Sequence, residues 1–252
     1  SGAARIEQAK SIRKVFLEFN INEGPTADPR VRKALNHAID VDSVIKTLFR
    51  GRAYGRDKGI IHEGFEGYQG DKLQAYTYDL DLAKKLLAEA GYPDGFEMPF
   101  WHPIGRYMLD KESSEAMAGQ LAKVGVKANL QGMESGAYFN KLTAERVPGA
   151  NFFSCGPLMF NPTFCAVVHY QSASGYGYGA NERTEQYIKD VQGELDAAKR
   201  VQKMQEFENY VFNDHVPWVW LWHQQDIYGA SNRINWKARP DELMTFEEAS
   251  FK

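Results

Sequence analysis

Apolar residues recur along the chain with two different spacings, and the spacing predicts which segments are strands and which are helices. Short runs rich in β-branched and aromatic residues are typical of strands, and segments with apolar residues three or four positions apart are typical of helices. Glycine-rich segments at 51–77 and 171–180, and the turn-rich stretch "GPLMFNP", are predicted to be irregular. The predicted strands are 12–20, 96–102, 126–131, 150–155 and 216–224, and the predicted helices are about 29–38, 41–49, 78–95, 111–125, 135–147, 182–191 and 195–213.

Three of the predicted helices carry start signals. In "ADPRVRKALNHAID", Asp28 is expected to cap the first backbone N–H groups, and Pro29 fits the first helical position. A second helix is predicted to start at Asp40, directly behind the first. A third starts with a cap at Asp79 and ends near Gly91, because glycine is favoured just past the last helical turn.

The order of these elements predicts the fold class. Between residues 96 and 155, strands and helices alternate, which requires crossover connections between strands of one sheet. We therefore expect an α/β sandwich with one main domain and a mixed sheet. In such sheets, ligands bind where loops leave the carboxyl ends of the strands. Those ends are expected near residues 101–106, 131–135, 155–161 and 222–224.

Tryptophans alternate along the most apolar predicted strand, "VPWVWLWHQ". Side chains two positions apart on a strand point to the same side, so Trp218, Trp220 and Trp222 are expected to share one face. Core packing is the favoured role for at least two of them. His223 follows the strand and is either a surface histidine, which we favour, or a residue that faces a ligand cleft.

Composition and charge narrow the functional classes. Of 252 residues, 43% are hydrophobic and 25% charged, which is enough apolar material for a globular core. The net charge of −3 argues against a nucleic-acid-binding protein, which usually has a basic excess on one face. No apolar run approaches the roughly 20 residues of a membrane-spanning helix.

The two cysteines leave two interpretations open. Cys155 and Cys165 are too few for a disulfide framework, and their spacing matches no zinc pattern. They form one bridge across a short loop if the compartment is oxidising, or they are two partly buried thiols. The second interpretation is the favoured one.

Motifs for catalysis, metals and cofactors are missing from the sequence. "HEG" at 62–64 is not a metalloprotease motif, and neither a nucleophile elbow nor a P-loop is present. The acidic pairs Asp79/Asp81 and Glu247/Glu248 are interpreted as helix-start and tail charges. We predict no catalytic residue, no metal ligand and no cofactor.

Four stretches, in family order, make the chain resemble a known family. It is similar to the C-terminal half of extracytoplasmic solute-binding proteins of peptide-type ABC importers, the dipeptide, oligopeptide and nickel class. The resemblance covers nearly the whole chain. The stretches are "DPRVRKALNHAIDVDSVIKTLFRGRA" (28–53), "YTYDLDLAKKLLAEAGYPDGFEM" (76–98), "GRYMLDKESSEAMAGQLAKVGVKANL" (105–130) and "ELDAAKRVQKMQEFENYVFNDHVPWVWLW" (194–222).

The resemblance implies a domain organisation and a set of partners. Residues 1–25 would be a crossover strand, residues 26–252 the C-terminal ligand-binding lobe, and an N-terminal lobe would precede Ser1. The partners would be a small polar solute or peptide, that other lobe, and a membrane permease, in a periplasmic or extracytoplasmic location. A sensory or chaperone-like receptor without transport, and an enzyme on the same scaffold, remain alternatives. The cluster Arg30, Arg32 and Lys33 is then expected to be a solvated or structural helix face.

The resemblance also implies where the ligand would bind. Peptide-binding relatives hold the ligand's ammonium group with an aspartate in a stretch resembling W-small-small-D-x-x-D-P, which corresponds here to residues 155–162. The aspartate positions fall on Leu158 and Asn161. Leucine cannot pair with an ammonium group, and an unpaired buried charge is unfavourable. A sugar, an opine-like or modified peptide, or another polar metabolite is therefore an expected ligand beside peptides.

Further ligand contacts are expected from residues near the predicted strand ends. Some relatives place an arginine for the ligand's carboxylate close to Arg106, and the guanidinium suits that role as a bidentate donor. Each candidate also has a structural interpretation: an exposed arginine, a core tryptophan or a solvent-facing loop tyrosine. The candidate ligand-binding residues are Trp101, His102, Arg106, Asn161, Tyr176, Tyr178 and His223.

Overall fold

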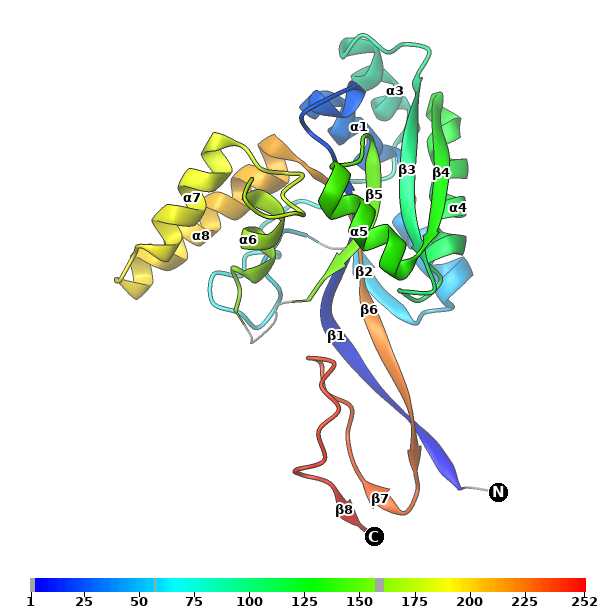
Figure 1. Cartoon of the computed structure of the whole chain (residues 1–252), viewed down its shortest axis with the longest axis vertical. Coiled ribbons are helices and arrows are strands. Elements are labelled where there is room, and N and C mark those ends of the chain that lie inside the picture. Colours follow the sequence, from blue (N-terminus) through cyan, green and yellow to red (C-terminus); the bar gives the residue numbers. More distant parts are fainter. Residues whose placement is uncertain (1–2, 57, 157–160) are drawn as a thin grey trace.

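The computed structural model describes residues 3–56, 58–156 and 161–252, and its centre is a six-stranded mixed sheet (Figure 1). The strand order is β2-β6-β1-β5-β3-β4. The central strand β1 pairs antiparallel with β5 and β6, whereas β3 pairs parallel with β4 and β5. The predicted mixed α/β sheet is therefore confirmed. Its strands are β1 (Ala4–Phe19), β2 (Ala53–Arg56), β3 (Phe96–Ile104), β4 (Val126–Glu134), β5 (Ala150–Cys155) and β6 (Trp218–Ser231).

Helices cover both faces of the sheet and divide the core into two apolar clusters. The first four helices pack on one cluster with Leu17, Phe100 and Phe152, and the last four pack on the other with Phe16 and Phe153. In Figure 1, α6, α7 and α8 lie together on the opposite side from α4. The helices are α1 (Pro29–Ala38), α2 (Val41–Val44), α3 (Leu80–Glu89), α4 (Asp110–Leu121), α5 (Ser135–Glu145), α6 (Phe164–Tyr170), α7 (Glu182–Gln192) and α8 (Ala197–Asn209).

The predicted helix starts are confirmed by their capping bonds. The side chain of Asp28 accepts the backbone N–H of Arg30 at 2.8 Å, and that of Asp79 accepts the N–H of Leu82 at 2.9 Å. Asp40 caps α2 in the same way. The segment predicted as one helix over 41–49 is α2 followed by a wider π-helical turn over Ile45–Phe49.

The expectation that the three tryptophans share a face is wrong. All three are buried, but Trp218 and Trp220 belong to one core cluster and Trp222 to the other. The reason is a bulge in the pairing of β6 with β1, where Val15 pairs with Trp222 while Phe16 pairs with Trp220. An extra residue in one strand reverses the side on which the following side chains point.

Strands β1 and β6 are longer than predicted and continue beyond the body of the protein. Residues 4–10 of β1 pair with residues 225–231 of β6 to form a two-stranded ribbon, visible below the body in Figure 1. The tail after the ribbon contains the short strands β7 (Ile234–Asn235) and β8 (Ser250–Phe251). Within the described residues, no helix has the length and apolar character needed to cross a membrane.

Candidate functional site

A cavity of about 430 Å³ lies where β1, β5, α6 and the turn after β3 meet. Its lining combines guanidinium groups with aromatic rings, so it offers both charge and apolar surface. The residues that line this cavity include Arg13, Arg106, Phe153, Ser154, His169 and Tyr176.

The two arginines of the cavity have different partners. Arg13 binds both carboxylate oxygens of Glu242 at 2.5 Å and donates to the hydroxyl of Ser154 at 3.1 Å. Burial opposes its charge, but the hydrogen bonds and the charge of Glu242 raise the pKa of Arg13 above its usual value. Arg106 lies over the ring of Tyr107, 5.0 Å from the centroid. Within the described ranges its guanidinium has no hydrogen bond or ion pair with another side chain, so it is the cation available to a ligand.

A tight turn after β3 presents Arg106 to the cavity. The carboxylate of Asp110 accepts the backbone N–H groups of Gly105, Arg106 and Tyr107 at 3.1, 2.8 and 2.9 Å. Gly105 has a φ of +78°, a left-handed conformation that other residues adopt with strain. Because Asp110 is buried, this turn is held at the start of α4 and fixes the position of the arginine backbone.

Aromatic side chains form the apolar wall of the cavity. The ring of Tyr176 lies 5.2 Å from that of Phe153 and 6.3 Å from that of Phe139. Burial raises the pKa of Tyr176, so its hydroxyl is protonated at neutral pH. The wall therefore offers ring surface and a neutral polar tip, which suits a ligand with both apolar and polar parts.

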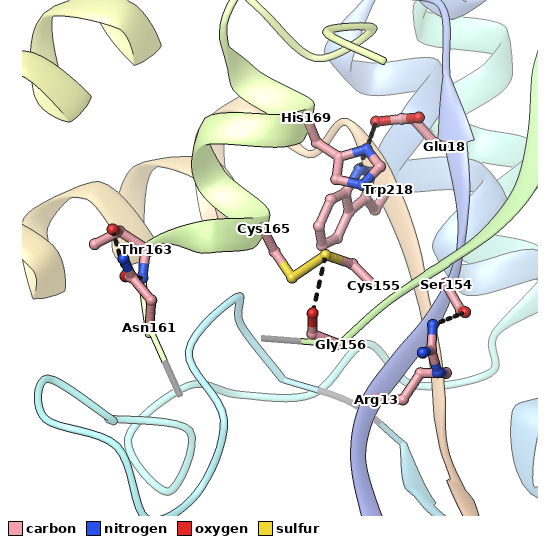
Figure 2. Close-up of a disulfide and its surroundings, with 10 residues drawn as sticks. All are labelled: Arg13, Glu18, Ser154, Cys155, Gly156, Asn161, Thr163, Cys165, His169 and Trp218. Atoms are coloured by element: carbon pink, nitrogen blue, oxygen red, sulfur yellow. Dashed lines mark hydrogen bonds and ion pairs between the residues drawn. A yellow bond between two sulfur atoms is a disulfide. The ribbon is translucent and has the colours of Figure 1, made fainter. Parts of the chain in front are cut away.

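A disulfide joins Cys155 at the end of β5 to Cys165 in α6 (Figure 2). The favoured expectation of two thiols is therefore wrong, because the fold brings the two residues within bonding distance across a ten-residue separation. Cys155 also lines the cavity. The bridge thus connects two of its walls, the strand that carries Ser154 and the helix that carries His169.

Behind the cavity, a buried carboxylate meets a buried histidine. Glu18 on β1 and His169 on α6 are both fully buried, and Nδ1 of His169 lies 2.7 Å from Oε1 of Glu18. The indole N–H of Trp218 donates to the same oxygen at 3.2 Å. Figure 2 shows the three side chains in one group above the disulfide.

Of the seven ligand-binding candidates from the sequence, Arg106 and Tyr176 line this cavity together. Trp101 donates its indole N–H to the carbonyl of Pro148 and lies under Lys141. His102 is buried, with Nδ1 2.9 Å from the carbonyl oxygen of Pro103. The hydroxyl of Tyr178 is buried between Val147 N–H and Leu142 carbonyl groups, so this tyrosine is a core residue.

The remaining candidates lie elsewhere. Asn161 is exposed and accepts the N–H of Thr163 at 2.9 Å. The ring of His223 stacks on that of Tyr54 at 5.2 Å and meets His62 edge-on. Leu158, at the position where relatives have an aspartate, lies outside the described residues.

Sequence reasoning missed Arg13, Ser154 and His169 as cavity residues. Arg13 and Ser154 lie on strands with no motif around them. His169 belongs to α6, a segment in which no helix was predicted. The available signal was polarity: a histidine in "FCAVVHY" is a polar side chain inside an otherwise apolar segment. Among the described residues, no three His, Cys, Asp or Glu side chains gather as a metal site requires.

Comparison with protein-family models gives one match. The model described as bacterial extracellular solute-binding proteins, family 5 Middle, matches residues 2–174. The curated relatives include the dipeptide-binding protein of Escherichia coli, 28% identical over 243 residues, and heme-binding protein A of Haemophilus influenzae, 27% identical over 233 residues. These alignments cover 87% and 90% of this chain but 43% and 42% of the relatives. The chain therefore spans less than half the length of these relatives.

Solved structures share the fold. The binding protein AgaA from A. tumefacien R10, in complex with agropinic acid, has a TM-score of 0.86 at 20% identity, covering 100% of this chain and 53% of AgaA. DppA from Helicobacter pylori, in complex with the peptide STSA, has a TM-score of 0.84 at 20% identity, covering 93% of this chain and 46% of DppA.

Proposed function

Because the chain belongs to family 5 of the bacterial extracellular solute-binding proteins, we propose that it captures a polar solute for an ABC importer. The solute would bind outside the cytoplasm and be delivered to a membrane permease without chemical change. Relatives named as dipeptide-binding and glutathione-binding proteins support this class of solute.

The observation that carries the proposal is the available guanidinium of Arg106 in a cavity of about 430 Å³. A guanidinium binds a carboxylate through two parallel N–H···O bonds, which add geometric specificity as well as energy. Arg13 is paired with Glu242, so Arg106 is the guanidinium among the described cavity residues that a solute can pair with. Tyr176 and Phe153 would cover the apolar part of the solute. We therefore propose a solute that carries a carboxylate.

We further propose that this cavity is one side of a larger cleft. The chain spans 42% to 49% of the lengths of its curated relatives, which include heme-binding, dipeptide-binding and glutathione-binding proteins. Binding proteins of this kind close two lobes on their ligand, and each lobe contributes contacts. Residues 26–252 would form one such lobe, with residues 1–25 as the strand that enters it. The affinity of this chain alone would then be low, and a method sensitive to weak binding is needed.

The test is a nuclear magnetic resonance titration of the 252-residue chain with alanyl-alanine and with glutathione. We expect shifts of backbone amides at residues 105–107, 153–156 and 174–176. Arg106→Gln should weaken binding at least about tenfold, the effect of losing one charge-assisted pair. The control is Arg200→Gln, an arginine on α8 away from the cavity, which should leave binding unchanged.

Two results would contradict the proposal. If both solutes shift amides only outside the cavity, the site is misplaced. If Arg106→Gln and Arg200→Gln bind alike, the carboxylate is not recognised by Arg106.

A further inference from the structure

The glycine- and tyrosine-rich loop over 171–180 uses its two tyrosines differently. Tyr178 is buried, and its hydroxyl donates to the carbonyl of Leu142 at 2.8 Å and accepts the N–H of Val147 at 2.9 Å. Tyr176, two residues earlier, is only partly buried and lines the proposed binding cavity. One tyrosine therefore anchors the loop in the core, and the other lies at the cavity wall.

Contacts with the end of α5 hold this loop in place. The guanidinium of Arg146 donates to the backbone carbonyls of Gly177 at 3.0 Å and of Ser172 at 2.7 Å. Gly177 also approaches the neighbouring backbone so closely that a Cβ atom there would lie 2.0 Å from the carbonyl oxygen of Gln171. The ring of Tyr176 is therefore positioned before a solute binds, which reduces the entropy lost on binding.

Tyr176 meets two phenylalanines from other elements at this wall. The ring planes of Phe139 on α5 and Phe153 on β5 cross at 78°, with centroids 5.6 Å apart. The ring of Tyr176 is inclined to these two rings at 87° and 62°, respectively. Phe139 and Tyr176 are both only partly buried and both line the cavity, so ring surface is accessible from it. Aromatic rings favour such edge-to-face pairs, and a further ring can join them in the same geometry.

We propose that Tyr176 and Phe139 form an aromatic subsite beside Arg106, and that it selects solutes with an aromatic ring on the residue that bears the carboxylate. This inference rests on the proposed function and narrows its class of solute. A ring in the subsite gains an edge-to-face contact that an aliphatic side chain of equal size lacks. The cavity of about 430 Å³ lies in the size range of small-molecule sites, so it has room for both groups.

A general apolar surface is the competing explanation, because Phe164 and Val168 of α6 also line the cavity. Such a surface would bind side chains according to their apolar area alone. Alanyl-phenylalanine and alanyl-cyclohexylalanine separate the two explanations, since the second compound keeps the ring shape and the apolar area but has no π-system. A general apolar surface would bind the cyclohexyl compound at least as tightly as the phenyl compound.

The experiment is the same titration with alanyl-alanine, alanyl-phenylalanine and alanyl-cyclohexylalanine. The wild-type chain should prefer the phenyl over the cyclohexyl compound about fivefold, the value of one aromatic pair. Tyr176→Phe keeps the ring and should keep this preference, whereas Tyr176→Leu should reduce it to about twofold or less. The matched control is Tyr78→Leu, an exposed tyrosine outside the cavity lining, which should leave the preference unchanged.

Three results would overturn this inference. If cavity amides shift but the cyclohexyl compound binds at least as tightly as the phenyl compound, the wall is a general apolar surface and the proposed function stands. If Tyr176→Leu keeps the full preference, another part of the chain recognises the ring, and again only the subsite is refuted. If none of the three compounds shifts an amide at residues 105–107 or 174–176, the proposed function fails for amino-acid-like solutes, and the subsite fails with it.

Discussion

At the scale of single residues, the same side-chain type has different roles a few positions apart. Arg30 is exposed and pairs with Asp28, whereas Arg32 is buried and donates to carbonyl oxygens of Thr26 and His215 at 2.7 and 2.5 Å. Burial lowers the pKa of Arg32 to about 10, yet it remains charged at neutral pH. The cluster was expected to be a solvated or structural helix face, and it is both: Arg30 is solvated, whereas Arg32 has a structural role. Arg32 donates hydrogen bonds to the carbonyl oxygen of His215 at the end of the π-helical turn Tyr210–His215, where a positive charge is favourable.

His215 makes stability depend on pH. Burial lowers its pKa to about 4, below the value of about 6.5 in the unfolded chain. Protons therefore bind the unfolded state more readily. The contribution of His215 to the free energy of unfolding is present above about pH 6.5, decreases as the pH falls, and changes no further below about pH 4. Between pH 7 and pH 5 we expect a loss of about 2 kcal/mol in the free energy of unfolding from this residue.

The measurement is urea unfolding of the wild type and of His215→Gln at both pH values. The variant is expected to be less stable at pH 7, since the hydrogen bond from Asn181 to Nδ1 and the stacking of the ring on Tyr210 are lost, but its stability should fall less between pH 7 and pH 5. Equal falls in both proteins would show that His215 titrates normally in the folded state.

At the scale of elements, α6 is the segment whose placement matters most for the site and whose sequence predicts it least. "FCAVVHY" is apolar nearly throughout and contains two adjacent valines, so no helical period is visible. Its position is set by burial of Cys165, Ala166 and Tyr170 and by the bridge to β5. A short helix without its own sequence signal therefore depends on tertiary contacts.

The bridge between Cys155 and Cys165 should contribute measurably to stability. Closing a loop of this length removes entropy from the unfolded chain worth about 2–3 kcal/mol. The free energy of urea unfolding should therefore fall by that amount when dithiothreitol reduces the wild type. The control is Cys155→Ala/Cys165→Ala, which should be less stable from the outset and insensitive to dithiothreitol. Identical midpoints for oxidised and reduced wild type would contradict this account.

At the scale of the whole molecule, the chain consists of a two-cluster body and a projecting ribbon. In the body, residues 15–18 of β1 have paired strands on both sides, while residues 4–10 pair with β6 alone. The ribbon and the tail expose large apolar side chains, among them Ile6 at 67% and Phe251 at 82%.

Hydrogen exchange should reveal this division in the isolated 252-residue chain. Amides of residues 4–10 are expected to exchange orders of magnitude faster than those of residues 15–18, because a two-stranded ribbon opens without unfolding the body. Mass spectrometry of peptic fragments would measure both segments in one experiment. Equal protection of the two segments would show that the ribbon belongs to the same cooperative unit as the body.

Much of the fold was predictable because local signals and tertiary structure agree. The caps at Asp28, Asp40 and Asp79 act within one helical turn, so the sequence alone predicts them. Arg106 was placed correctly at the end of a strand, and Tyr176 was found as an aromatic residue in a glycine-rich loop. Whether either contacts a solute stays a prediction.

The sequence by itself determined the helix starts, the alternation of strands and helices, and hence the mixed α/β sheet, because these depend on interactions between near neighbours. Tertiary structure alone decided the bulge that moves Trp222 to the other core cluster, the disulfide, and the meeting of Glu18 with His169 across a separation of 151 residues. These features depend on register and on long-range burial. No local pattern encodes these features, because the residues next to each partner in the sequence do not specify which distant residue it contacts.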